Sequence, residues 1–207
     1  MPWTAISEKT GKHVNLALKQ VQSTFFNTNV FKDAMGHKFI CPNCGNKVSP
    51  VKRANTRIYF RHAPIDHNKC TEKLVGYDNS NNHFEAVCAL CQYLEDKYKE
   101  NVYRNLYGET YLLTEYSFKN ISRRADIVLF NSENKPIVVH EVQISKISSE
   151  EVESRTNDYE SIDLECIWHF GLAAALDKNL TEWFIRKYGY LDTCITVFDQ
   201  PERGIAM

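Results

Sequence analysis

The sequence lacks any long apolar run: no stretch approaches the ~20 residues that a helix needs to cross a bilayer. It has no recognisable signal peptide, and its seven cysteines, an odd number, favour a reducing compartment over a disulfide-bonded secreted fold. It also has no glycine-rich phosphate loop, so nucleotide hydrolysis has no support. We therefore expect a soluble, cytoplasmic protein.

Length and charge set broad limits on the organisation. At 207 residues the chain suits one medium-sized domain and a small module. Residues 32–73 hold nine Lys or Arg against three Asp or Glu, a local net of +6, so the overall charge of −1 leaves −7 elsewhere. The polar segment Asp78–Asn82 reads as a linker. We expect an amino-terminal region at 1–77 and a second domain at 83–207.

The most informative feature is a predicted β-hairpin. Residues 124–130 and 137–145 are strand-like, and Asn131–Pro136 between them contains residues typical of turns. If the hairpin is symmetric about that turn, Asp126 faces Glu141 with Cβ atoms about 4.5–5.5 Å apart. The polar pair lies at one edge of a hairpin whose two faces are otherwise largely apolar, which is typical of a sheet covered on both sides.

Two opposed carboxylates need a compensating partner. At about 5 Å and an effective dielectric near 20 their repulsion is roughly 3 kcal/mol. A basic bridge from Arg124 is the purely structural explanation. The alternative is a metal site, because Asp126, Glu141 and the backbone carbonyl of Val142 offer the hard oxygen ligands that Mg²⁺ or Mn²⁺ prefers. Gln143 points to the same side as Glu141, so its amide could orient a water or complete the ligand shell.

The flanking segments predict an α/β order of helix, three antiparallel strands, helix and fourth strand. Residues 83–99 show helical apolar spacing, and Thr110–Phe118 is β-branched and aromatic. Ser148–Glu151 is a capping box that opens a helix to about Glu160. Cys166–Phe170 is strand-like.

The pairing of the first of these strands is less constrained. A symmetric loop at Lys119–Arg123 places Tyr116, rather than Glu115, beside Asp126. Glu115 is therefore either a further ligand or a plain surface carboxylate.

These residues resemble the competence protein CoiA-like family, which is similar in turn to the PD-(D/E)XK nucleases. The resemblance covers about residues 36–170 and rests on these motifs, in chain order: Cys41-Pro-Asn-Cys44, Phe60-Arg-His62, His83, Arg123-Arg-Ala-Asp126, Glu141-Val-Gln-Ile-Ser145, Arg155, Tyr159 and Ile167-Trp168. It implies a restriction-endonuclease-like core that hydrolyses DNA phosphodiester bonds with Mg²⁺ or Mn²⁺. Asp126, Glu141 and Gln143 would be catalytic, and Arg124 is a candidate for the charge of the Lys that Gln143 replaces.

The resemblance also marks further candidates for the site. His83 matches a helix-start histidine of the family, although an ordinary histidine at a helix end is the alternative. Glu85 is a helical acid of a kind that completes some sites in the superfamily. Arg155 and Tyr159 either contact phosphate or brace Glu141, and we prefer bracing.

A second constellation has the spacing of a zinc site. Cys41 and Cys44 could grip one tetrahedral Zn²⁺ from a tight turn, and Cys70 with His62 or His67 would complete four ligands. The resemblance favours His62, whereas the tidier spacing belongs to His67. Reduced, unliganded cysteines are the alternative.

The other cysteines are expected to pack in the core. Cys88 and Cys91 lie on the apolar stripe of the first predicted helix, where free Cys behaves as a small hydrophobe, and Cys166 and Cys194 have similar surroundings. The zinc module at about 36–75 has few large apolar residues and would need its ion to fold.

DNA is the partner that the charge pattern favours, with RNA as an alternative. A basic run without acids suits phosphate contacts, which drive affinity without reading sequence, although a solvated basic loop is the simpler interpretation. The candidate nucleic-acid-binding residues are Lys52, Arg53, Arg57, Arg61, Lys119, Arg123 and Lys146. A catalytically inactive binding or assembly subunit is the alternative function, and protein partners in recombination, mobile-element or defence complexes stay open.

Overall fold

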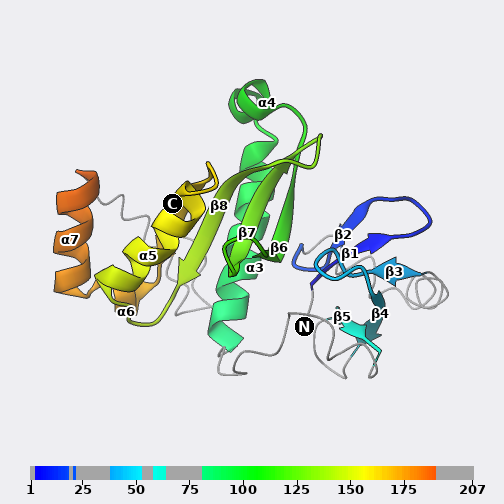
Figure 1. Cartoon of the computed structure of the whole chain (residues 1–207), viewed down its shortest axis with the longest axis horizontal. Coiled ribbons are helices and arrows are strands. Elements are labelled where there is room, and N and C mark those ends of the chain that lie inside the picture. The colour runs from blue at the N-terminus through cyan, green and yellow to red at the C-terminus, as the bar shows by residue number, and fades with distance from the viewer. Residues whose placement is uncertain (1–2, 19–20, 22–37, 53–57, 64–80, 190–207) are drawn as a thin grey trace.

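The computed structural model describes residues 3–18, 21, 38–52, 58–63 and 81–189, which form a mixed α/β structure with two sheets (Figure 1). The first sheet is antiparallel, in the order β2-β1-β3-β4-β5. Its strands are β1 (Thr4–Ser7), β2 (His13–Asn15), β3 (Phe39–Ile40), β4 (Lys47–Lys52) and β5 (Ile58–His62). No helix in the described part of the chain is long and apolar enough to span a membrane.

The second sheet has the order β6-β7-β8-β9 and contains the predicted hairpin. Its first three strands are an antiparallel meander, and β9 pairs parallel to β8. Parallel neighbours need a crossover, which a helix supplies here. The elements are α3 (Asn81–Tyr98), α4 (Asn101–Tyr107), β6 (Thr110–Phe118), β7 (Arg123–Asn131), β8 (Pro136–Gln143), α5 (Ser149–Glu160), β9 (Glu165–Phe170), α6 (Leu172–Ala175) and α7 (Lys178–Tyr188). The predicted order of helix, meander, helix and strand is therefore present.

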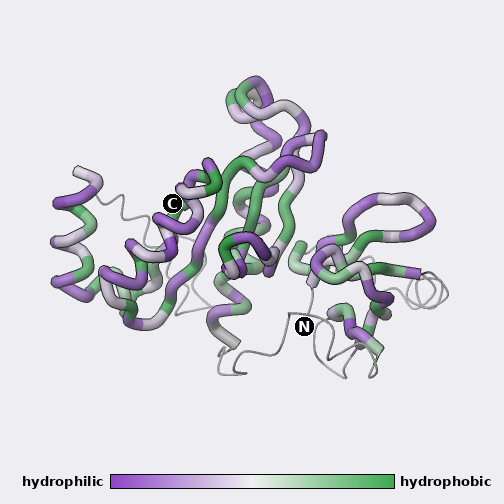
Figure 2. The backbone as a smooth tube through the Cα atoms, viewed as in Figure 1, coloured by the Kyte–Doolittle hydropathy of each residue, from purple (hydrophilic) through white to green (hydrophobic). Residues whose placement is uncertain are grey.

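Both faces of the second sheet are covered, as the apolar character of its strands predicts. Ile127, Leu129 and Val142 pack with α3 on one face. Val128 and Val139 pack with Tyr159 of α5 on the other. Hydrophobic segments accordingly run through the central strands, whereas the connecting turns are more hydrophilic (Figure 2). The predicted cap of α5 is present, since the hydroxyl of Ser148 accepts a hydrogen bond from the Glu151 amide at 3.2 Å.

The pairing of β7 with β8 confirms the register predicted from the turn. The observed pairs are Ile127 with His140, Val128 with Val139 and Leu129 with Val138, as predicted. Beside the turn the register shifts by one, so Phe130 pairs with Pro136 rather than with Ile137. Asp126 and Glu141 occupy the next positions outward along the two strands.

The pairing of β6 with β7 differs from the symmetric loop expected from the sequence. Tyr116 pairs with Ala125, not with Asp126. The reason is a turn one residue shorter than expected: Ser122 has a left-handed φ of 54°, and Arg123 already belongs to β7, where it pairs with Phe118. Glu115 therefore lies opposite Asp126.

The amino-terminal sheet has its own apolar core and also contacts helix α3. Trp3 stacks on Phe84 of α3 with ring centroids 4.0 Å apart. Cys194, which was expected to pack in the core, lies outside the described residues. The proposed division of the chain near 78–82 stays a prediction.

Candidate active site

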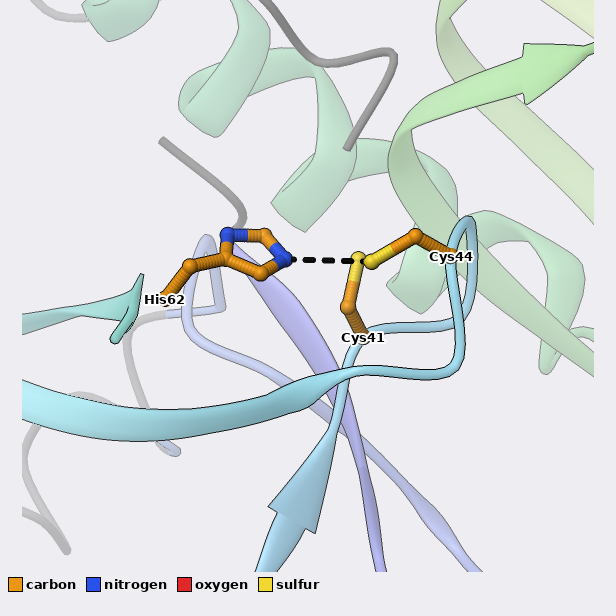
Figure 3. Close-up of side chains that lie close together, drawn as sticks. All are labelled: Cys41, Cys44 and His62. Atoms are coloured by element: carbon orange, nitrogen blue, oxygen red, sulfur yellow. Dashed lines mark hydrogen bonds between the residues drawn. The ribbon is translucent and has the colours of Figure 1, made fainter. Parts of the chain in front are cut away.

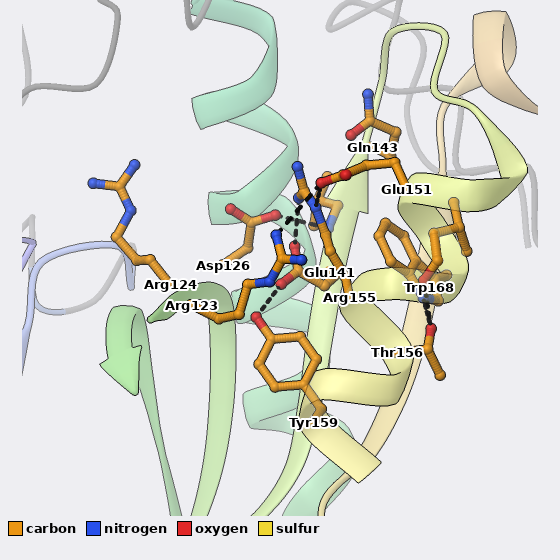
Figure 4. A network of polar contacts seen from close by, with 12 residues as sticks. Arg123, Arg124, Asp126, Glu141, Gln143, Glu151, Arg155, Thr156, Tyr159 and Trp168 are labelled. Carbon is orange, nitrogen blue, oxygen red and sulfur yellow. Dashed lines mark hydrogen bonds and ion pairs between the residues drawn. The ribbon is translucent and has the colours of Figure 1, made fainter. Parts of the chain in front are cut away.

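Glu141 is buried at the end of β8, with only 2% of its surface exposed. The hydroxyl of Tyr159 donates to its Oε1 at 2.6 Å, and Arg155 Nη1 lies 3.5 Å from its Oε2 (Figure 4). Burial, together with the charge of Asp126, raises the pKa of Glu141 to about 8, although Tyr159 and Arg155 oppose this. The two α5 side chains therefore occupy the bracing positions that we preferred for them.

Asp126 and the backbone at Val142 are joined through His83, near the start of α3. The Asp126 Oδ2 atom accepts a hydrogen bond from the Val142 amide at 2.8 Å. His83 Nε2 lies 3.4 Å from the same oxygen and 3.0 Å from the carbonyl oxygen of Val142. Burial opposes protonation of His83, but Asp126, Glu115 and this carbonyl outweigh it and raise its pKa to about 9. His83 Nε2 thus lies where a carboxylate oxygen and a carbonyl oxygen come together.

Glu115 adds a third carboxylate, because the pairing of β6 with β7 sets it opposite Asp126. Burial raises the pKa of Glu115, the charge of Arg124 lowers it, and that of Asp126 raises it further. Arg124 Nε lies 3.1 Å from Glu115 Oε2. Arg124 therefore pairs with Glu115 rather than forming the bridge to Asp126 and Glu141 that was the alternative to a metal site, and Figure 4 shows its guanidinium directed away from them. Of the two arginines, Arg155 is the one that contacts Glu141.

Gln143 and Glu85 are placed differently from the central carboxylates. The Gln143 amide nitrogen donates to the backbone and hydroxyl oxygens of Ser145, at 3.0 and 2.9 Å. Glu85 follows His83 by two residues on α3, and residues at this spacing do not share a helix face. Their catalytic roles stay predictions.

The donor set of this cluster suits a divalent cation. Asp126, Glu141 and the Val142 carbonyl provide hard oxygens, and the raised pKa of Glu141 reflects excess negative charge in a buried place. The contacts of His83 show that one Asp126 oxygen and the Val142 carbonyl oxygen both lie near a single nitrogen atom. Asp126, Glu141 and Val142 are therefore the residues that could hold Mg²⁺ or Mn²⁺.

A second group of ligand-type atoms lies in the amino-terminal sheet, in the turn after β3 and on β5. Cys41 Sγ, Cys44 Sγ and a ring nitrogen of His62 all lie within 4.8 Å of one another (Figure 3). His62 Nε2 is 3.3 Å from Cys44 Sγ, and both Cys41 and His62 are buried. The turn closes with a left-handed Gly45, whose amide donates to the Cys41 carbonyl at 2.9 Å. Two thiols and an imidazole at these separations could serve as three of the four ligands of a tetrahedral zinc site.

The remaining cysteine and histidine predictions have mixed outcomes. Cys70 and His67, the candidates for further zinc ligands, lie outside the described residues. Cys88 and Cys91 are buried in the core beneath the second sheet, which confirms their predicted packing role. Cys166 is partly buried against the cluster on the opposite face.

The predicted nucleic-acid-binding residues are spread over both halves. Lys52 and Arg61 are exposed on β4 and β5, Lys119 lies in the turn after β6, and Lys146 follows β8. Arg53 and Arg57 lie outside the described residues. Arg123 contacts α5, donating to Asp158 Oδ2 at 2.6 Å and to Ser154 Oγ at 3.0 Å. Nucleic-acid binding by all seven stays a prediction.

The sequence did not predict the role of Asn43, which connects the turn of Cys41 and Cys44 with the sheet that carries the carboxylates. Asn43, between the paired cysteines, makes hydrogen bonds to the backbone of β6 on both sides of Tyr116. Its place inside a Cys-Pro-Asn-Cys motif was visible in the sequence, but the strand that it contacts lies more than 70 residues away.

Comparison with protein families places this site in a known context. The family model "Competence protein CoiA, nuclease-like domain" matches residues 80–199, more than half of the chain. The match includes Asp126, Glu141 and every other residue assigned to the carboxylate cluster. Comparisons with curated proteins and with solved structures give no match.

Proposed function

The chain belongs to the family of the CoiA nuclease-like domain, and from this we propose that it is a metal-dependent nuclease that hydrolyses DNA phosphodiester bonds on a PD-(D/E)XK-type core. The observation that supports the proposal is the placement of Asp126 and Glu141 on paired strands, close enough for the charge of Asp126 to raise the pKa of Glu141 (Figure 4). Arg155 and His83 compensate part of the charge of the buried Glu141 and the half-buried Asp126, and a divalent cation would compensate the rest.

In this proposal Asp126, Glu141 and the Val142 carbonyl hold one Mg²⁺ or Mn²⁺. When bound, such an ion polarises the scissile phosphate and lowers the pKa of an attacking water. Tyr159 and Arg155 fix Glu141, one by its 2.6 Å hydrogen bond and the other by its charge.

Arg155 also supplies positive charge beside the developing phosphorane, the part that the family's Lys would otherwise play. Gln143, on the same face of β8 as Glu141, orients the water when its amide leaves Ser145.

The amino-terminal sheet takes a supporting role in the same proposal. Cys41, Cys44 and His62 hold a structural Zn²⁺ together with a ligand from the segment that contains His67 and Cys70. The exposed Lys52 and Arg61 on neighbouring strands then contact phosphates of the substrate.

The direct test is cleavage of plasmid, single-stranded and branched DNA with Mg²⁺, with Mn²⁺ and with EDTA. Asp126→Ala and Glu141→Ala should each lower the rate by at least about 100-fold, because each removes an ionic ligand. Cleavage that survives both substitutions would identify a contaminating nuclease and contradict the proposal.

A second candidate is a nucleic-acid-binding or assembly subunit that has kept the fold without cleavage. The observation that favours it is the engagement of Gln143 with Ser145, since this residue departs from the Glu-x-Lys form. Gln143→Lys distinguishes the two. An active enzyme is expected to tolerate the change or cleave faster, whereas an inactive subunit stays inactive yet binds DNA.

A further inference from the structure

The free edge of β6 is covered by polar side chains from the amino-terminal sheet. β6 is the edge strand of the second sheet, and the outward-facing backbone groups of such a strand need partners. Thr4 Oγ1 accepts from the Thr114 amide at 3.4 Å, and Asn15 Nδ2 donates to the Leu112 carbonyl at 3.1 Å. These contacts hold the first half of the strand.

Asn43 holds the second half of the strand with both ends of its amide. Its Nδ2 donates to the carbonyl of Glu115, and its Oδ1 accepts from the amide of Ser117, each at 3.3 Å. Asn43 is 93% buried and lies between Cys41 and Cys44, the two thiols of the candidate zinc site. A metal ion that fixes both cysteines would therefore also fix this asparagine.

The contact falls on a strained point of the strand. Glu115 has a φ of 57°, a left-handed conformation that a residue with a Cβ rarely adopts inside a strand unless its surroundings impose it. It lies opposite Asp126, and its carboxylate pairs with Arg124. The backbone conformation that Asn43 secures therefore sets where the Glu115 carboxylate lies, paired with Arg124 and within electrostatic reach of Asp126 and His83.

We propose that Asn43 is a positioning residue. Through the backbone of β6, it makes the affinity of the divalent-cation site depend on whether the Cys41–Cys44–His62 site holds a metal ion. The inference rests on the proposed function, because it assigns Asn43 and Glu115 to the setting of the active-site carboxylates. Zinc in the first site holds Asn43, Asn43 holds the left-handed bend at Glu115, and the bend sets the negative potential around Asp126.

The test is the affinity of the full chain for Mn²⁺, measured by calorimetric titration at a fixed pH, in Asn43→Ala and in a matched control. Asn15→Ala is that control, because Asn15 is 6% exposed against 7% for Asn43 and holds the same strand, but through Leu112. We expect Asn43→Ala to weaken Mn²⁺ binding by about 10-fold, the lower end of the cost of losing a residue that orients a ligand, because Glu115 acts on the site through its charge and is not itself a proposed ligand. Asn15→Ala should change it by less than about threefold.

Two further readouts separate positioning from a general loss of structure. Hydrogen exchange of the Ser117 amide should speed up in Asn43→Ala, while zinc content and circular dichroism stay those of the parent protein. Cys44→Ser should weaken Mn²⁺ binding in the same direction. Should Asn43→Ala fail to fold, Asn43→Asp takes its place, since it keeps the acceptor for Ser117 and loses the donor to Glu115.

Unchanged Mn²⁺ affinity in a folded, zinc-loaded Asn43 variant overturns the proposal, and so does an equal loss in Asn15→Ala. These measurements need no cleavage. A chain that binds Mn²⁺ in an Asn43-dependent way but never cuts DNA would refute the nuclease activity and leave the coupling intact. DNA cleavage together with an Mn²⁺ affinity that does not depend on Asn43 would refute the coupling and leave the nuclease activity intact.

Discussion

At the scale of single residues, Glu141 shows how a buried acid can suit a metal site. Its surroundings disfavour the charged form, since burial and Asp126 raise its pKa to about 8. Tyr159 and Arg155 offset only part of this, so the side chain is held in place while its pKa stays raised. A divalent cation would complete the compensation.

The first prediction concerns Glu141→Gln. At pH 7, below its raised pKa, the metal-free protein should keep a Tm within a few degrees of the parent, because the acid is then mostly uncharged. In Mn²⁺ at about 100 times Kd the parent should gain roughly 5–10 °C, and the variant should lose most of that gain. Thermal unfolding followed by circular dichroism measures both.

Glu151→Gln is the control, because Glu151 contacts Arg155 from the same helix but is 43% exposed and is not a proposed ligand. It should retain the rise in Tm that Mn²⁺ produces. An equal loss of that rise in both variants would mean that Mn²⁺ acts through surface carboxylates.

The second prediction concerns the cysteines. Cys44→Ser should lower the zinc content of the purified chain from about one ion to well below one, because a hydroxyl is a poor zinc ligand at neutral pH. Cys91 belongs to a Cys-x-x-Cys pair of the same spacing but lies in the core, so the Cys91→Ala protein should keep its zinc ion. Elemental analysis by mass spectrometry measures the zinc content per chain. An equal content in the parent and in Cys44→Ser would mean that the ion binds at another site.

At the scale of secondary-structure elements, the pairing of β8 with β9 buries two neutral histidines. His140 Nδ1 and His169 Nε2 lie 3.0 Å apart, and Tyr98 contacts the other ring nitrogen of His140. Burial lowers the pKa of His169 to about 4 and that of His140 well below its usual value. Acid should therefore weaken this side of the sheet.

The third prediction follows from the sign of that shift. The pKa of His169 is lower in the folded than in the unfolded state, so its contribution to stability is present above about pH 6.5 and is lost as the pH falls toward 4. The loss should approach about 3 kcal/mol at pH 4. Urea unfolding from pH 7 to pH 4 measures it, and His169→Gln should show a shallower decline. Parallel pH curves for the parent and variant would contradict the assignment.

The two strand pairings show what the sequence could and could not predict. The β7–β8 register followed from a turn whose Asn and Pro mark its ends, so the meeting of Asp126 and Glu141 was predictable. The β6–β7 turn has no such limits, and one left-handed residue, Ser122, moved Glu115 into the place expected for Tyr116.

Contacts between distant parts of the chain were beyond sequence reasoning for a related reason. The Arg124–Glu115 pair does not follow from local spacing, because it depends on the register of β6. The hydrogen bonds from Asn43 to β6 do not follow from it either, because they depend on how the first sheet packs against the second.

At the scale of the whole molecule, the basic excess and the carboxylates of the proposed site belong to different parts of the chain. The local excess of +6 at residues 32–73 belongs to the amino-terminal part, and the carboxylate cluster lies in the second sheet. The second sheet's edge strand β6 contacts the first through Thr4, Asn15 and Asn43. On the proposed function, substrate bound by Lys52 and Arg61 would lie on the sheet that contacts β6.

The fourth prediction concerns salt dependence. Replacing both Lys52 and Arg61 with Ala should weaken DNA binding and reduce the slope of log K against log salt by about two, because each phosphate contact contributes about 0.9. Lys178→Ala on α7 is the control, since that side chain is exposed and remote in sequence from the basic run. Fluorescence anisotropy at several salt concentrations measures the slope. An unchanged slope in the double variant would favour a protein partner for this surface.

Anomalous scattering from crystals soaked in Mn²⁺ tests most directly whether Asp126 and Glu141 bind a divalent cation. We predict an ion about 2.0–2.3 Å from carboxylate oxygens of Asp126 and Glu141 and from the Val142 carbonyl. Crystals that show no ion there at saturating Mn²⁺, with Asp126 and Glu141 still ordered, would contradict it.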